Sequence, residues 1–92
     1  MLVVFTDLGW EDYIFWQKED RKKLAKVNAL IKDIERNGNG GLGLPEPLVG
    51  NLSGFWSRRI DAKNRLIYRI SEEDGNRRLE IVQCRSHYRA LL

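Results

Sequence analysis

The segment from residue 37 to residue 47 constrains the fold of this chain most, because it contains four glycines and both prolines of the sequence. Glycine and proline are unfavourable inside helices, and proline is excluded from central strands. Hydrophobic residues recur every three or four positions before this segment and alternate with polar residues after it. The sequence therefore divides into a helical half and a strand half, joined by an irregular loop.

The N-terminal half predicts one short strand and two helices. Residues 2–5 are apolar and mostly β-branched or aromatic, which is typical of a buried strand. Thr6 or Asp7 can cap a first helix, and Asp20 can begin a second helix that ends at Gly38. We expect the two helices to be antiparallel, since only a short turn joins them. The second helix carries an apolar stripe at helical spacing: Leu24, Val27, Ile31 and Ile34.

The C-terminal half predicts three strands, at residues 52–60, 65–70 and 79–84. Residues 61–64 can link the first pair as a hairpin, and the turn sequence Asp74-Gly75-Asn76 can link the second. We therefore expect one α+β domain spanning residues 1–92. Its twisted antiparallel β-sheet should carry the two N-terminal helices packed on one face.

The balance of charges is mildly basic, with 16 basic and 13 acidic residues and a net charge of +3. Arginine predominates among the basic residues of the second half, and its planar guanidinium suits phosphate. A solvated sheet face explains the same pattern, and on charge alone it is the slightly better explanation. No apolar run approaches the length of a membrane span, and the single cysteine, Cys84, fits a reducing compartment. We expect a cytoplasmic protein.

The sequence lacks the patterns that hold metals and nucleotide cofactors. One histidine and one cysteine cannot make a zinc site, and no acidic run matches a calcium loop. The glycine-rich residues 38–43 neither follow a predicted strand nor precede a helix, as a phosphate-binding loop would. We therefore expect neither a metal nor a cofactor, which leaves acid–base chemistry supported by arginine.

Five residues form a set that is suited to cleaving RNA without a metal. Glu46 lies between two prolines that stiffen its backbone, and it can act as a base toward a 2′-hydroxyl. Arg59 and Arg65 flank one predicted hairpin turn, where both can stabilise negative charge on a phosphate. His87 can protonate the leaving oxygen, and Tyr88 can stack on a base or orient the phosphate.

The residues alone do not single out this chemistry. A lone histidine after the last strand is more often an exposed residue without a role. The aromatic residues of the chain are more often core than RNA-stacking platforms. The set is consistent with RNA cleavage, and it needs a second source of support.

That support comes from a resemblance that covers nearly the whole chain. The sequence resembles the YoeB (Txe/YoeB) toxins of bacterial type II toxin–antitoxin pairs, which belong to the wider RelE group. The most specific block is Asn-Leu-Ser-Gly-Phe-Trp-Ser-Arg-Arg-Ile, and the closing His-Tyr pair makes chance agreement improbable. The matching segments are Trp10–Tyr13, Leu30–Asp33, Pro45–Leu48, Asn51–Ile60, Asn64–Tyr68 and Cys84–Tyr88.

The resemblance implies a microbial-RNase-like α+β fold and a toxin that cuts messenger RNA in the decoding site of the ribosome. It assigns the base to Glu46, the phosphate-stabilising group to Arg65 and the acid to His87, with support from Tyr88 and Arg59. Further RNA contacts are expected from Arg85 and Lys63.

The resemblance also implies partners. They are a YefM-like antitoxin protein, the ribosome, messenger RNA and a second copy of the chain in a homodimer. Operator DNA is expected to be contacted only through the antitoxin, and no contact with a membrane is expected.

The chain departs from the family pattern at several places. Val49 replaces a frequent lysine, and Ser86 replaces a frequent aromatic residue. The hairpin at residues 71–79 is longer than usual, and Arg89–Leu92 follow the His-Tyr pair. Two alternatives therefore stay open. One is a non-catalytic module that binds RNA or the ribosome, and the other is a transcriptional co-repressor that acts only when bound to its antitoxin.

Overall fold

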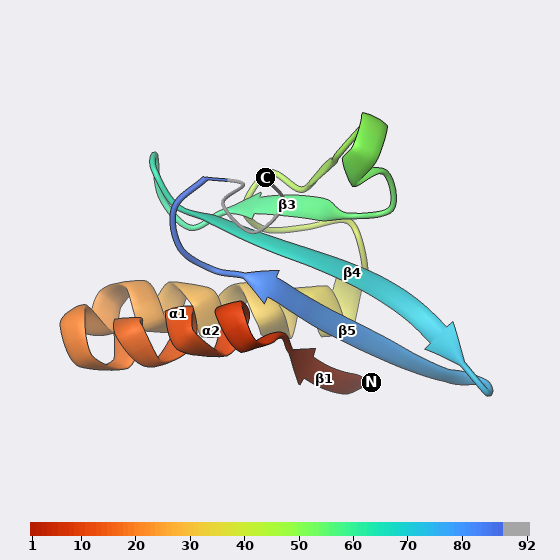
Figure 1. The fold of residues 1–92 in the computed structure, drawn as a ribbon, viewed down its shortest axis with the longest axis horizontal. Helices are drawn as coiled ribbons and strands as arrows, with labels where there is room; N and C mark the ends of the chain where they lie inside the picture. The colour runs from red at the N-terminus through yellow and green to blue at the C-terminus, as the bar shows by residue number, and fades with distance from the viewer. Residues whose placement is uncertain (88–92) are drawn as a thin grey trace.

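The computed structural model describes residues 1–87, in which two helices cover one face of a five-stranded sheet (Figure 1). Helix α1 (Asp7–Glu19) begins where the Thr6 hydroxyl accepts a hydrogen bond of 3.0 Å from the Gly9 N–H. Helix α2 (Arg21–Asn37) begins in the same way at the Asp20 carboxylate and ends at Gly38, whose φ is 61°. Both helices and both caps confirm the sequence-based prediction.

The sheet has the strand order β1-β5-β4-β3-β2. Its strands are β1 (Leu2–Phe5), β2 (Glu46–Pro47), β3 (Trp56–Arg59), β4 (Arg65–Glu73) and β5 (Asn76–Gln83). Neighbouring strands are antiparallel except β1, which runs parallel to β5. The sheet is therefore mixed: β1 lies at its edge and runs in the same direction as β5.

The segment before β3 differs from the sequence-based prediction. The expected strand at residues 52–60 is only four residues long, since a 3-10 turn forms at Gly50–Leu52 and Gly54 adopts a φ of 97°. Glu46 and Pro47 instead form a short edge strand that pairs with Ser57 and Trp56. An edge position suits Pro47, which has no N–H to donate to the sheet.

Two apolar clusters lie on the two faces of the sheet. The larger cluster joins Val27, Leu30 and Ile34 of α2 to Tyr68 and Ile81 of the sheet. Helix α1 packs closely on β5 because Gly9 has no side chain, and a Cβ there would lie 2.5 Å from the Ile81 carbonyl oxygen. The smaller cluster covers part of the opposite face: Leu48, Ile67 and Val82, with Leu52 and Phe55 against them.

Within residues 1–87, neither helix has the length and apolar character that crossing a membrane requires.

Candidate active site

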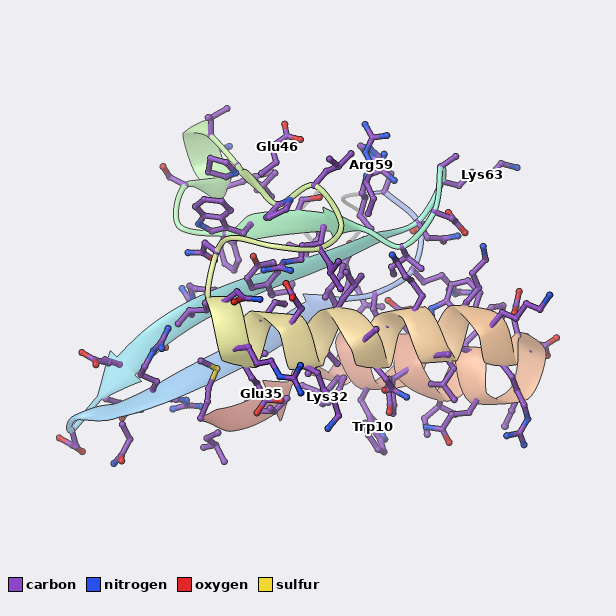
Figure 2. The ribbon with its side chains drawn as sticks, turned by 180° about the vertical axis from the view of Figure 1, so that it is seen from behind. Trp10, Lys32, Glu35, Glu46, Arg59 and Lys63 are labelled. Carbon is purple, nitrogen blue, oxygen red and sulfur yellow. The ribbon has the colours of Figure 1, made fainter. Side chains whose placement is uncertain are left out.

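The strand register brings three of the expected site residues to the face of the sheet opposite the helices. Glu46 pairs with Ser57, and Arg59 pairs with Arg65 across β3 and β4. Side chains alternate along a strand, so all four lie on the same face, which we call the open face. Figure 2 shows Glu46 and Arg59 pointing away from α2, with Lys63 on the turn beyond them.

Glu46 is exposed, and its carboxylate makes no hydrogen bond or ion pair with any residue in 1–87. Its position follows from the backbone on either side. Gly43 and Leu44 both have positive φ, at 82° and 53°, and the Gly43 carbonyl accepts a hydrogen bond of 2.7 Å from the Arg59 N–H. Glycine is favoured at this turn, because Gly43 has a φ of 82° and a Cβ there would lie 2.8 Å from the Leu30 side chain and 3.2 Å from the Arg59 carbonyl oxygen.

The glycine loop before Glu46 is held by Arg58, whose side chain is fully buried. Its guanidinium donates to the Asp33 carboxylate at 2.6 Å and to three backbone carbonyls, those of Gly38, Gly40 and Leu42, at 2.6 to 2.8 Å. Its Nε donates to the Tyr68 hydroxyl at 3.2 Å. Arg58 therefore ties α2, the loop and β4 together.

The electrostatics around Arg58 follow from these contacts. The Arg58 guanidinium and the Leu42 N–H hold the pKa of Asp33 below its usual range. Burial raises the pKa of Tyr68. Sequence reasoning grouped Arg58 with the other arginines of the second half. The alternation along β3 is the signal that separates them, because Arg58 shares a face with Trp56 and Arg59 does not.

Arg65 is almost buried at the start of β4, with 9% of its surface exposed. Its Nη1 donates to the carbonyl oxygens of Asp61, Ala62 and Asn64 at 2.8, 3.4 and 3.2 Å. Within residues 1–87, Nε and Nη2 of Arg65 make no hydrogen bond. The hairpin turn thus fixes the guanidinium while leaving it donors for an anion.

The chain turns back after β5 (Figure 1), and Ser86, the residue before His87, lies beside the start of β4. The Arg65 N–H donates to the Ser86 carbonyl at 3.0 Å, and Gln83 Nε2 donates to the same oxygen at 3.2 Å. His87 itself is exposed. The structure therefore brings the backbone of His87 to the end of the sheet where Arg59 and Arg65 lie. Tyr88 lies outside the described residues.

Comparison with known proteins identifies the family. The family model described as a YoeB-like toxin of bacterial type II toxin–antitoxin systems matches residues 5–88. The chain belongs to the YoeB toxins. The toxin YoeB of Streptomyces coelicolor is 50% identical over 88 residues, which are 96% of this chain and 100% of that protein.

Solved structures agree with this assignment. A YoeB/ParE toxin from Agrobacterium tumefaciens superposes with a TM-score of 0.91 at 48% identity, covering 96% of this chain and 100% of the other. A Staphylococcus aureus YoeB has been solved as a dimer and in a YoeB–YefM complex. Both match with a TM-score of 0.83, at 40% and 39% identity, over 96% of this chain and 98% and 99% of theirs.

Two further residues expected to bind RNA in this YoeB toxin lie in different surroundings. Lys63 is exposed on the β3–β4 turn, on the side of the open face (Figure 2). Arg85 instead packs against α1, with its guanidinium 4.0 Å from the ring centre of Phe15 and its Nε 3.5 Å from the Asp12 carboxylate. RNA binding by either residue stays a prediction.

In the part of the chain that the structure describes, no enclosed pocket lies on the open face of this YoeB toxin. Among residues 1–87, no three His, Cys, Asp or Glu side chains are grouped so that they could hold a metal ion. Val49 is exposed next to β2 and adds no charge to this surface. The charged groups of the open face include the carboxylate of Glu46, the cations of Arg59 and Arg65, and the ion pair of Arg69 with Glu80, with Lys63 on the adjacent turn.

Proposed function

We propose that this toxin is a metal-independent endoribonuclease that cuts messenger RNA in the decoding site of the ribosome. One observation carries the proposal. A carboxylate and two guanidinium groups share the open face at Glu46, Arg59 and Arg65, and the backbone of His87 lies at its end. This arrangement supports a base at Glu46, anion-stabilising groups at Arg59 and Arg65, and an acid at His87.

The proposed reaction is attack of a ribose 2′-hydroxyl on the adjacent phosphate. Glu46 takes the proton of the 2′-hydroxyl as the new oxygen–phosphorus bond forms. Arg65 and Arg59 stabilise the charge that builds on the non-bridging oxygens. His87 gives a proton to the departing 5′-oxygen as the old bond breaks. The products are a 2′,3′-cyclic phosphate and a 5′-hydroxyl, and Tyr88 is proposed to orient the phosphate.

The site is open among residues 1–87, which supports a substrate that another body holds in place. A site whose described residues enclose no pocket offers few contacts to orient a free, flexible strand, and orientation supplies much of the rate in such reactions. The ribosome holds a message in an extended conformation, so it can supply that orientation. This substrate places the proposed activity in the cytoplasm.

Glu46 favours an enzyme over a module that only binds RNA. Its exposed carboxylate lies on the same face as Arg59 and Arg65, where it repels phosphate. A surface selected only to bind RNA gains nothing from this charge, whereas a base is needed for cleavage.

The partners proposed for this chain follow from its relatives. The YoeB–YefM complex from Staphylococcus aureus supports a YefM-like antitoxin partner, and the YoeB dimer from the same organism supports a homodimer. Contact with operator DNA is proposed to occur only through the antitoxin.

The proposal is tested by cleavage on ribosomes that carry a defined message. Wild type, His87→Ala and Glu46→Gln would be incubated with these ribosomes, and the 5′ ends of the fragments would be mapped, with EDTA-treated naked RNA as the control for metal dependence. We expect cuts in the decoding site by the wild type alone, with 5′-hydroxyl ends. Equal ribosome binding by all three proteins with no cuts by any of them would establish the binding module instead.

A further inference from the structure

The turn between β3 and β4 contacts two parts of the proposed catalytic set. Its residue Asn64 binds both Arg65 and Ser86, the residue before His87. The Asp61 carboxylate accepts hydrogen bonds from the N–H groups of Lys63 and Asn64 at 2.8 and 2.7 Å. It also accepts the side-chain amide of Asn64, at 3.1 Å to Oδ1 and 2.9 Å to Oδ2. A carboxylate only accepts, so the amide Nδ2 of Asn64 must face Asp61 and its Oδ1 must face away.

Asp61 is itself held in its charged form. Burial raises its pKa, but the ammonium of Lys23 and the N–H groups of Asn64 outweigh this effect, so the pKa lies well below its usual range. Lys23 reaches Asp61 Oδ2 from α2 at 2.9 Å. The orientation of the Asn64 amide is therefore tied to the helical layer of the molecule.

The outward-facing oxygen of Asn64 accepts the N–H of Ser86 at 2.7 Å. Ser86 has a φ of 57°, the left-handed conformation that residues other than glycine rarely adopt. Its carbonyl is held by the Arg65 N–H and by Gln83 Nε2. The peptide groups on both sides of Ser86 are thus fixed, and the next residue is His87.

The same turn holds Arg65. The backbone carbonyls of Asn64 and Asp61 accept from the Arg65 guanidinium at 3.2 and 2.8 Å. Asn64 therefore contacts Arg65 with its main chain and the residue before His87 with its side chain. The side chain of Asn64 is only partly buried.

We infer that Asn64 is a positioning residue, which holds Ser86 in the left-handed conformation and thereby sets the placement of His87 relative to Arg65. The catalytic part of this inference rests on the proposed function. Loss of the Asn64 side chain lets Ser86 relax to a negative φ, which displaces His87 from the phosphate that Arg65 binds. We expect the side chains of Arg59 and Lys63, which the Asn64 side chain does not contact, to stay in place.

The test separates the cleavage step from binding. Asn64→Ala is compared with wild type at saturating ribosome concentration, with Asn76→Ala at the far hairpin as the matched control. We expect the cleavage rate of Asn64→Ala to fall about 10- to 100-fold, as misplacement of a catalytic group does. Ribosome affinity and melting temperature should stay close to those of the wild type, and Asn76→Ala should cleave normally.

A second variant tests the mechanism. Glycine adopts the left-handed conformation without cost, so Ser86→Gly added to Asn64→Ala should restore part of the lost rate. The single variant Asn64→Asp should cleave as slowly as Asn64→Ala. The new carboxylate cannot donate a hydrogen bond to Asp61, and the two negative charges repel each other. Wild-type cleavage by Asn64→Ala would overturn the inference. So would a parallel loss of melting temperature and ribosome affinity, which marks a purely structural role.

An NMR measurement distinguishes this inference from the proposed function. In the isolated toxin, the amide signals of Ser86 and His87 should shift in Asn64→Ala and stay unchanged in Asn76→Ala. If the wild type does not cut RNA but these signals shift, the proposed function fails while the positioning of His87 stands. Unchanged signals in Asn64→Ala would overturn the positioning, whatever the wild type cuts.

Discussion

Arg58 and Arg59 are neighbours in the sequence and occupy opposite faces of β3. Arg58 is fully buried and donates five hydrogen bonds, to a carboxylate, a hydroxyl and three carbonyls. Arg59 is exposed on the open face, and its side chain makes no hydrogen bond or ion pair with any residue in 1–87. Two residues with the same charge therefore differ in every contact they make.

The difference shows that the count of arginines in a sequence is a poor guide to nucleic-acid binding. A buried guanidinium whose donors are all used has nothing left for a phosphate, and it serves the fold. An exposed guanidinium without protein partners contributes little to the fold, and its donors can bind a ligand. We propose that the two faces of β3 divide their work in this way, and four experiments test the division.

Removal of Arg58 should have the largest effect. Arg58→Met leaves the Asp33 carboxylate and three loop carbonyls without their donor, and loss of one partner from a buried pair costs about 3 to 5 kcal/mol. Thermal or denaturant unfolding measures this loss. Arg58→Lys should fall between Met and wild type, since it keeps the charge but not the planar fork. A Met variant as stable as the wild type would show that Arg58 does not hold the loop.

Removal of Arg59 should leave stability unchanged and reduce cleavage. Loss of one donor to the developing charge costs about 10²-fold in rate. Arg59→Ala would be assayed on programmed ribosomes beside Arg77→Ala, which removes an exposed arginine from β5 outside the open face. If both variants cleave equally well, or if Arg59→Ala unfolds readily, the proposed division between the two arginines is wrong.

Acid should lower the stability that Asp33 and Asp61 give to the folded protein. The pKa values of Asp33 and Asp61 are lowered in the folded protein. Their contribution is therefore fully present above the ordinary carboxyl pKa of 3.8 and is lost as pH falls below it, through the lower folded values. The unfolding free energy measured from pH 7 to pH 2 should decline in this range. Asp33→Asn should flatten the decline, and an unchanged slope would contradict the assignment.

Lys63 should give the smallest effect. Lys63→Ala removes one exposed cation beside the open face, whereas Lys32→Ala removes one from the helical side (Figure 2). If Lys63 contacts an RNA phosphate, its loss lowers the salt dependence of ribosome binding by about one unit of the logarithmic slope. Lys32→Ala should leave the slope as in the wild type. Equal slopes for both variants would remove Lys63 from the RNA-binding surface.

The sequence predicted the elements with local signals and missed features that depend on distant residues. Helix caps at Thr6 and Asp20 and the turn at Asp74–Gly75 follow from residue type alone, and the structure confirms them. The parallel pairing of β1 and the short strand at Glu46 were not predicted, because partners far along the chain create them.

The site residues also divide into those with a local sequence signal and those whose role depends on distant parts of the chain. Glu46, Arg59 and Arg65 were identified as candidates, and alternation along paired strands explains why they share a face. The work of Arg58 and Asn64 could not be predicted, since it depends on carbonyls and a left-handed Ser86 that only the folded chain brings near. The role of each catalytic candidate stays a prediction.

The pairing of β1 with β5 has a consequence for the synthesis of the chain. Leu2 lies opposite Arg78, and the Thr6 hydroxyl donates to the Val82 carbonyl, 76 residues away. Two side chains of α1 also bind a residue made late: the Asp12 carboxylate accepts from the N–H of Cys84, just after β5, and Trp16 Nε1 donates to its carbonyl. The first strand therefore emerges long before its partner and stays unpaired until β5 is made, although α1 can already contact α2 through Tyr13 and Asn28. We therefore expect a chain that ends before β5 not to reach this fold.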